Sequence, residues 1–349
     1  MFDFYKNKSV FITGHTGFKG TWLCRLLLQS GANVTGYALE PPTTPSLFYQ
    51  TATGKNIHSI IDDIRNRNIL MKAVQEAKPD IVFHMAAQPL VRLSYREPVD
   101  TYEINVMGTA NILEAVRSVS TIRSFVNITT DKVYENKEWH WGYRENENLC
   151  GYDPYSNSKS CSELVTYSYR NSFFSTHDFP AISTARSGNV IGGGDYAEDR
   201  IIPDCIRAME TGGVLSLRNP NSIRPYQHVL ECLCGYLLLA KKQYDNKSIE
   251  GAYNFGPDNE GCVTTEKLVN MFCEAWGKGA TWRVHGNDGP HEANFLKLDC
   301  SSAKAILGWK PKWKIEKAVE KTVEFANVKT DDERTACIDR QICMYYYSI

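Results

Sequence analysis

A glycine-rich turn near the start of the chain restricts its fold more than any other feature. The short β-branched run Ser9–Thr13 leads directly into three glycines, each three residues from the next, and an amphipathic segment follows. Glycine is needed where a chain turns tightly, where its backbone meets a diphosphate, and where a helix packs closely on a strand. Free N–H groups at the start of the helix would bind the phosphate oxygens. The order of strand, turn and helix predicts a dinucleotide site formed by Gly14, Thr16, Gly17, Phe18 and Gly20.

Short β-branched runs alternate with longer amphipathic runs through the first half of the chain. This alternation is typical of βαβ units, so we predict an α/β fold with a doubly wound parallel sheet of the Rossmann type. The expected strands are Ser9–Thr13, Asn33–Ala38, Ile81–Ala86 and Ser124–Thr129, and the expected helices are Gly20–Ser30, Asn68–Ala77, Val99–Val119 and Pro154–Phe174.

The alternation of strand and helix patterns becomes less regular near Gly188, and the predicted elements after it are shorter. The run Gly251–Gly256 is nevertheless typical of one more strand. We therefore expect two lobes whose chain segments interleave. The first is a dinucleotide-binding domain of residues 1–188 to which 225–257 return. The second is a smaller substrate lobe of residues 189–224 and 258–325. Residues 326–349 form a tail that is either a docked helix or a frayed end.

Charge and cysteine content exclude several classes of partner. The formal net charge of −1 gives no overall attraction to nucleic acid or to an anionic membrane. No stretch is long and apolar enough to span a bilayer, and Met1–Asn7 lacks the apolar region of a signal peptide. The eleven cysteines are scattered, so we expect reduced thiols and a cytoplasmic location. Neither His15 nor His84 belongs to a cluster with ligand spacing, so we expect no metal.

Segments that follow the predicted strands would meet the cofactor. An acid usually follows the second strand and binds the adenosine ribose, but only Glu40 is near, and it comes slightly late. No arginine is present there to favour a 2′-phosphate, so we predict NAD rather than NADP. Further contacts would come from Asp63 and Ile64 near the adenine and from Ala86, Ala87 and Gln88 along the cofactor, although each could equally be a plain loop.

Tyr155 and Lys159 are four residues apart and share one face of a predicted helix. A nearby ammonium stabilises a phenolate, so such a tyrosine can act as a base well below its free pKa of about 10. The alternative, a surface pair, is less favoured because the pair follows a glycine fingerprint and the predicted strand Ser124–Thr129. That strand ends in Thr130, Asp131 and Lys132, which would face the ligand crevice beyond the carboxyl ends of the strands, although a surface loop could have the same sequence.

Together these motifs resemble the extended short-chain dehydrogenase/reductases, also described as the NAD-dependent epimerase/dehydratase family. Within them, the chain resembles the sugar-nucleotide 4,6-dehydratases, and most of all the branch that acts on CDP-glucose. The resemblance extends roughly to residue 325 and includes residues 13–20, 84–92, 130–132, 136–139, 151–159 and 224–229.

The resemblance implies a role for each catalytic candidate. Tyr155, helped by Lys159, would take the proton of the sugar 4-hydroxyl while NAD⁺ takes the C4 hydride, and Thr130 would bind the same oxygen. Asp131 would protonate the departing 6-hydroxyl. Lys132 stands where most of these dehydratases carry the Glu that removes the C5 proton. It would be that base, which requires a depressed pKa, or it would stabilise the enolate by its charge.

The resemblance also implies substrate contacts and an assembly. Asn189 would lie at the substrate diphosphate. Arginine binds phosphate bidentately, so Arg200, Arg218 and Arg224 are candidates, although the first two could be ordinary surface residues. His291 would reach the substrate or have only a supporting or surface role. A homodimer or a dimer of dimers is expected, and the choice of CDP depends on resemblance alone.

Two other functions stay open. A sugar-nucleotide 4-epimerase would share the glycine loop and the Tyr155–Lys159 pair, but it needs no acid and base beside Thr130. A non-catalytic dinucleotide-binding regulator could have the same fold, although it would have no need to keep the catalytic set.

Overall fold

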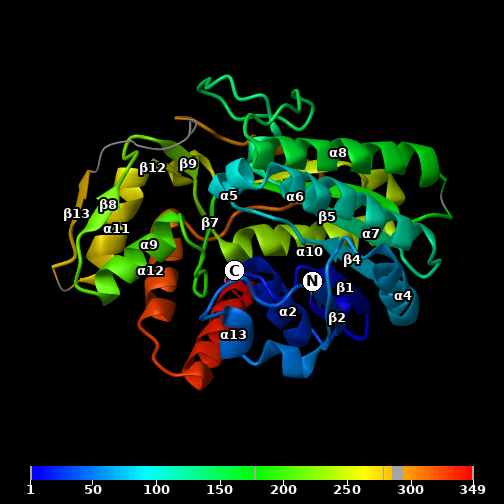
Figure 1. Cartoon of the computed structure of the whole chain (residues 1–349), viewed down its shortest axis with the longest axis horizontal. Helices are drawn as coiled ribbons and strands as arrows, with labels where there is room; N and C mark the ends of the chain where they lie inside the picture. The colour runs from blue at the N-terminus through cyan, green and yellow to red at the C-terminus, as the bar shows by residue number, and fades with distance from the viewer. Residues whose placement is uncertain (1, 177, 278, 285–293, 348–349) are drawn as a thin grey trace.

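A computed structural model describes residues 2–176, 178–277, 279–284 and 294–347. Within these residues, the centre of the fold is a parallel sheet of seven strands in the order β11-β6-β5-β4-β1-β2-β3 (Figure 1). The order reverses between β1 and β4, which is where open α/β sheets bind ligands. The strands are β1 (Ser9–Thr13), β2 (Asn33–Ala38), β3 (His58–Ile61), β4 (Ile81–His84), β5 (Ser124–Ile128), β6 (Ala181–Ser187) and β11 (Ala252–Phe255).

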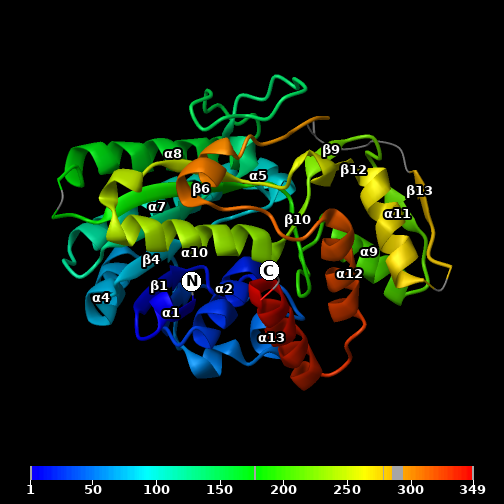
Figure 2. The same ribbon diagram turned by 180° about the vertical axis from the view of Figure 1, so that it is seen from behind.

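Helices cover both faces of this sheet, as Figures 1 and 2 show from opposite sides. One face carries α4 (Arg67–Ala77), α7 (Gly108–Arg117) and α8 (Pro154–Phe173), and the other carries α2 (Phe18–Gln29) and α10 (Val229–Asp245). Shorter helical segments are α1 (Phe2–Tyr5), α3 (Leu47–Gln50), Thr53–Asn56, α5 (Val91–Arg96), α6 (Pro98–Tyr102), Glu103–Met107, Asp131–Val133, Lys247–Ile249, Asn259–Gly261 and Ala303–Leu307.

Alternating side chains of the central strands supply the core on each face, because successive residues of a strand point to opposite sides. In β1, Val10 and Ile12 pack into the hydrophobic cluster with α2 and α10. Phe11, between them, packs into the cluster with α4 and α7. All three side chains are fully buried. The doubly wound α/β architecture predicted from the alternation of runs is thereby confirmed, and it fixes the carboxyl ends of β1, β4, β5 and β6 along one edge.

One predicted helix differs from the structure. The expected single helix over Val99–Val119 consists of α6 and α7 joined by a π-helical turn at Glu103–Met107. Asn105 in this turn accepts a hydrogen bond from the Gln88 backbone N–H (2.9 Å) and donates to the Gln88 carbonyl (3.1 Å). A π-helical turn contains one residue more than an α-helical turn, and here it places Asn105 in contact with Gln88. The hydrophobic periodicity of the sequence does not predict such a contact.

A smaller lobe lies beyond the carboxyl edge of the sheet, on the left in Figure 1. Its side chains form a third hydrophobic cluster. The predicted lobe boundaries stay predictions, although β11 does join the main sheet. The elements of this region are β7 (Val190–Ile191), α9 (Ile201–Glu210), β8 (Leu215–Leu217), β9 (Ile223–Pro225), β10 (Gln227–His228), β12 (Cys262–Thr264), α11 (Thr265–Trp276), β13 (Trp282–Val284) and α12 (Ile315–Ala326).

The tail forms a docked helix, α13 (Asp331–Tyr347), which lies against α2 (Figure 2). Arg25 of α2 forms an ion pair with Asp339, and the Tyr345 hydroxyl donates to buried Glu231 of α10 at 2.6 Å. Of the two alternatives for the tail, the helix is therefore correct. Among the described helices, none has the length and hydropathy needed to cross a bilayer.

Candidate active site

The glycine loop joins β1 to α2 and has the shape of a phosphate cradle. Gly14 has a φ of +79°, and a Cβ there would lie 2.7 Å from the Ala86 backbone nitrogen. A Cβ on Gly20 would lie 2.1 Å from the Gly14 carbonyl oxygen. No side chain caps the start of α2, where Gly17 is the N-cap residue, whereas Asp153 caps α8. The first N–H groups of α2 therefore remain available to donate hydrogen bonds to an anion. The loop fits the diphosphate of a dinucleotide.

The other predicted cofactor residues lie at the same edge of the sheet. Thr16 anchors the loop to the end of β2 through a 2.8 Å hydrogen bond to the Leu39 carbonyl. The Asp63 carboxylate forms an ion pair with Arg65, and Ile64 packs into the core. Gln88 is buried, and its side chain donates to Thr101 at 2.9 Å. The side chains of Asp63, Ile64 and Gln88 thus have partners within the protein.

His84 of β4 is packed in the core of the protein. It is 1% exposed. Its ring nitrogens lie 2.7 Å from the Thr13 hydroxyl and 3.1 Å from the Thr109 hydroxyl. Within the described part of the chain, no group of His, Cys, Asp and Glu side chains has the arrangement of a metal site.

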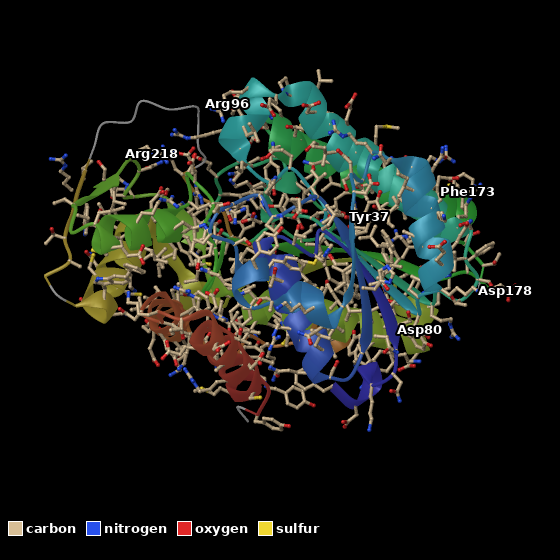
Figure 3. The ribbon with its side chains drawn as sticks, turned by 60° about the horizontal axis from the view of Figure 1, so that its bottom comes forward. Tyr37, Asp80, Arg96, Phe173, Asp178 and Arg218 are labelled. Carbon is tan, nitrogen blue, oxygen red and sulfur yellow. The ribbon has the colours of Figure 1, made fainter. Side chains whose placement is uncertain are left out.

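A cleft of about 940 Å³ between the sheet edge and the smaller lobe brings most of the predicted site together. In Figure 3, Arg96 lies on α5 and Arg218 on the lobe, and both residues line this cleft. Lys159 and the glycines of the loop are not among the lining residues. The predicted residues that line the cleft are Thr130, Asp131, Lys132, Tyr155, Asn189, Arg200, Arg218 and Arg224.

Tyr155 and Lys159 lie on α8, which begins at Pro154 with Asp153 as its cap; the Asp153 carboxylate accepts from the Ser156 N–H at 2.9 Å. Proline at the first position and an acidic cap are both typical of a helix start. Burial raises the pKa of Tyr155 to about 12, and a hydrogen bond with Thr130 opposes this shift. Burial also lowers the pKa of Lys159 to about 8. The Lys159 ammonium donates to the Ile128 carbonyl at 3.2 Å.

Asp131 is 2% exposed and lies in the turn that follows β5. One carboxylate oxygen accepts from the Thr130 hydroxyl at 3.0 Å, and the other has no hydrogen-bond partner among the described residues. Burial raises the pKa of this carboxyl, although Lys132 and Thr130 oppose the shift. A buried carboxyl with a raised pKa and a free oxygen can carry a proton to a group in the cleft.

The three arginines of the lobe have different surroundings. Arg200 pairs with Asp195 at 2.9 Å, and Arg218 pairs with Asp199 at 3.2 Å. Arg224 is only 8% exposed, on β9. The Asn189 backbone carbonyl accepts from Gln227, which joins the segment after β6 to the lobe. His291, the remaining candidate, lies outside the described residues.

Two charged residues at the site received no role from the sequence. The Lys19 ammonium in α2 lines the cleft and donates to the Ser187 hydroxyl at 3.1 Å. Glu163, one turn beyond Lys159 on α8, forms a buried ion pair with Arg186 at 2.9 Å. Lys19 could have been noticed as a cation inside the glycine motif, and Glu163 through its spacing from Lys159. Nothing in the sequence indicates that Glu163 of the helix pairs with Arg186 of β6.

The amino-acid sequence is similar to those of known nucleotide-sugar dehydratases. Residues 11–322 match the GDP-mannose 4,6 dehydratase family. The chain is 49% identical to the CDP-glucose 4,6-dehydratase of Salmonella typhimurium, over 98% of this chain and 97% of that protein.

Solved structures share the fold. A Bacillus cereus UDP-glucuronic acid 4-epimerase, solved with UDP-glucuronic acid and NAD, has a TM-score of 0.78 at 23% identity and covers 91% of this chain and 98% of its own. The dTDP-glucose 4,6-dehydratase DesIV of Streptomyces venezuelae, solved with NAD, has a TM-score of 0.78 at 21% identity and covers 90% and 95%. From the family match over most of its length and the identity to the Salmonella protein, the chain belongs to the GDP-mannose 4,6 dehydratase family.

Proposed function

We propose that this protein is an NAD-dependent 4,6-dehydratase that converts CDP-glucose to CDP-4-dehydro-6-deoxyglucose. The observation that carries the proposal is the set Thr130, Asp131 and Lys132 lining one cleft with Tyr155. An epimerase needs the tyrosine and its lysine, but only a dehydratase needs an acid and a base at the adjacent carbon atoms. The 49% identity to a CDP-glucose 4,6-dehydratase supports both the reaction and the choice of CDP.

The glycine loop would hold NAD through the backbone N–H groups of Gly17, Phe18 and neighbouring residues at the start of α2. NAD would supply the acceptor for the C4 hydride and the hydride that later reduces C6, with a proton restored at C5. The close approach of Gly14 to Ala86 supports this assignment, since any larger residue would push the loop away from the sheet edge.

Tyr155 would take the proton of the sugar 4-hydroxyl, and Thr130 would orient the same oxygen. Burial holds the Tyr155 pKa at about 12, so the phenolate requires help from neighbouring charge. Lys159, one turn further along α8, is the catalytic candidate that shares this face of the helix. Its positive charge would stabilise the phenolate and lower the barrier to proton removal.

Elimination of water would use the two residues after Thr130. Once C4 is a ketone, the C5 proton becomes acidic, and Lys132 would remove it or stabilise the enolate by its charge. Asp131 would protonate the 6-hydroxyl as it leaves. The raised pKa of buried Asp131 supports this acid role, because it keeps a larger fraction protonated near neutral pH.

The arginines of the lobe and Asn189 would bind the substrate diphosphate. Each guanidinium can bond two phosphate oxygens. Arg200 and Arg218 now pair with Asp195 and Asp199, so the diphosphate would compete with these carboxylates. Arg224 is the most buried of the three arginines. Each of its contacts with the diphosphate would contribute most to the binding free energy, because partly buried charges are screened less by salt.

An assay of the NAD-loaded protein against CDP-glucose, dTDP-glucose, UDP-glucose and GDP-mannose tests the proposal. The expected result is a product lighter by one water, with the alkaline absorbance of a 4-keto-6-deoxy sugar, formed fastest from CDP-glucose. A product of unchanged mass, such as the C4 epimer, would refute the dehydratase. A faster reaction with another nucleotide would refute the choice of CDP. Tyr155→Phe serves as the inactive control.

We also propose that the protein is a homodimer formed through α8 and the α6–α7 segment. Four large apolar side chains there are more than half exposed, namely Val99, Met107, Leu164 and Tyr167. Exposed apolar residues grouped in this way are typical of protein interfaces. Light scattering should give twice the monomer mass, and Leu164→Asp should give the monomer; a monomeric parent protein would refute the dimer.

The eleven free cysteines support a reduced, cytoplasmic location.

A further inference from the structure

Tyr155, Lys159 and Glu163 follow one another at four-residue intervals on α8 and therefore share one face of the helix. Tyr155 is 9% exposed, Lys159 is 5% and Glu163 is 3%. Tyr155 and Lys159 have roles in the proposed mechanism, whereas the Glu163 carboxylate has none. Carboxylates are rarely buried unless they are paired, so the position of Glu163 requires an explanation.

The Glu163 carboxylate joins α8 to the two strands that end at the catalytic loops. One oxygen accepts from the Thr129 hydroxyl and from Arg186 Nε at 2.9 Å. The other accepts from the Thr184 hydroxyl at 2.6 Å and from Arg186 Nη2 at 2.9 Å. Thr129 precedes Thr130, and Arg186 precedes the cleft residue Ser187. One side chain thus fixes the register of α8 against both β5 and β6.

Arg186 is itself held from the opposite side. Its Nη1 donates to the Tyr134 hydroxyl at 2.8 Å and to the Glu145 carbonyl at 3.0 Å. Its guanidinium also lies over the Tyr134 ring, 5.0 Å from the centroid. A buried ion pair adds little net stability compared with a well-packed apolar pair. What the Glu163–Arg186 pair adds is therefore a fixed geometry, which holds the Glu163 carboxylate one helical turn from Lys159.

The titratable groups around Lys159 come from three elements. Lys19 of α2 disfavours the protonated ammonium, and Glu163 of α8 favours it, while burial is the largest effect and lowers the pKa of Lys159. His84 of β4 also faces Lys159, but burial lowers the pKa of this histidine to about 3, so it is neutral. Glu163 is thus the acidic group that opposes burial and Lys19.

We propose that Glu163 is a positioning residue for the catalytic pair: its carboxylate, fixed by Arg186, Thr129 and Thr184, holds α8 in register and keeps the Lys159 ammonium protonated. This inference rests on the proposed function, in which Lys159 assists Tyr155. Loss of the negative charge would let Lys159 lose its proton at a lower pH, so the rate would fall earlier as the pH rises.

The test compares the pH dependence of kcat with CDP-glucose in the NAD-loaded parent protein and in variants. Glu163→Gln keeps the shape but removes the charge, whereas Glu163→Asp keeps the charge. The double variant Glu163→Met with Arg186→Leu removes both charges and leaves no unpaired ion, so it should fold even if Glu163→Gln does not. Glu320→Gln, on the exposed face of α12, is the control for net charge.

The alkaline fall in kcat should move about one pH unit lower in Glu163→Gln, with KM changed less than about twofold. It should also move lower in the double variant, but less far, because that variant loses the Arg186 cation together with the carboxylate. It should stay at the parent pH in Glu163→Asp and Glu320→Gln. A parent-like pH profile in a folded variant that lacks the charge would overturn the inference and leave the proposed function intact. A parent protein that does not dehydrate CDP-glucose would overturn both.

Discussion

Replacing Glu231 by Gln should remove a pH-dependent contribution to the stability of the C-terminal helix. Glu231 lies on α10 and is fully buried. Its carboxylate accepts from the backbone N–H groups of Lys312 at 3.0 Å and Trp313 at 2.6 Å, and from the Tyr345 hydroxyl of α13 at 2.6 Å. Glutamine can keep these bonds, since its oxygen accepts from the backbone and the Tyr345 hydroxyl can turn to accept from its amide.

The expected magnitude follows from the pKa of Glu231. Burial raises this pKa from an ordinary value of 4.5 to about 7. A shift of this size corresponds to about 3 kcal/mol of unfolding free energy. Because the folded-state pKa is the higher one, the stabilising contribution is fully present below about pH 4.5 and is lost as the pH rises through about 7. Glutamine has no proton to lose, so the variant lacks this loss.

Urea unfolding followed by tryptophan fluorescence, measured from pH 5 to 8.5, gives the difference in unfolding free energy between variant and parent. This difference should move in favour of Glu231→Gln by about 2 to 3 kcal/mol across the range. The exposed control Glu320→Gln should show a difference that does not depend on pH. A flat difference for Glu231→Gln would refute the reasoning, because it would mean that Glu231 has an ordinary pKa in the folded protein.

Three further predictions concern the site. Lys132→Met should still oxidise the sugar at C4 but should lose elimination, so a 4-keto sugar that retains its 6-hydroxyl should be detected by mass spectrometry; normal dehydration would exclude Lys132 from the mechanism. Gly14→Ala places a Cβ 2.7 Å from the Ala86 nitrogen at a φ of +79°, so NAD affinity measured by calorimetry should fall at least about tenfold; unchanged affinity would contradict the assigned site. Arg186→Met leaves the buried Glu163 charge unpaired and should cost about 3 to 5 kcal/mol in urea unfolding; a loss below about 1 kcal/mol would contradict the pairing.

The strands could be predicted because their signal is local. β1 and β2 have the predicted bounds, since β-branched and apolar residues mark a buried strand within a few positions. The π-helical turn at Asn105 could not be predicted in this way, because it accompanies hydrogen bonds to Gln88, far along the chain. For the same reason the sequence does not decide between a docked helix and a frayed end for the tail, since the docking depends on a contact of Tyr345 with Glu231.

For the site, motif and spacing identified eight of the residues that line the cleft, but not their partners. The ion pairs of Arg218 with Asp199 and of Glu163 with Arg186 join residues whose proximity is created by the fold. Sequence spacing within one helix indicates which residues share a face, as for Tyr155 and Lys159. It contains no information about which strand that face meets, and the role of Glu163 depends on that contact.

The transfer of hydrogen within one sugar tests the proposed reaction most directly. CDP-glucose carrying deuterium at C4 is incubated with the NAD-loaded protein, and the position of the deuterium in the product is determined by NMR. Oxidation at C4, elimination of water and return of the same hydride predict that the deuterium appears in the C6 methyl group of a 4-keto product. Deuterium that stays at C4 in a product of unchanged mass, or that is lost to solvent, would contradict the proposed dehydratase.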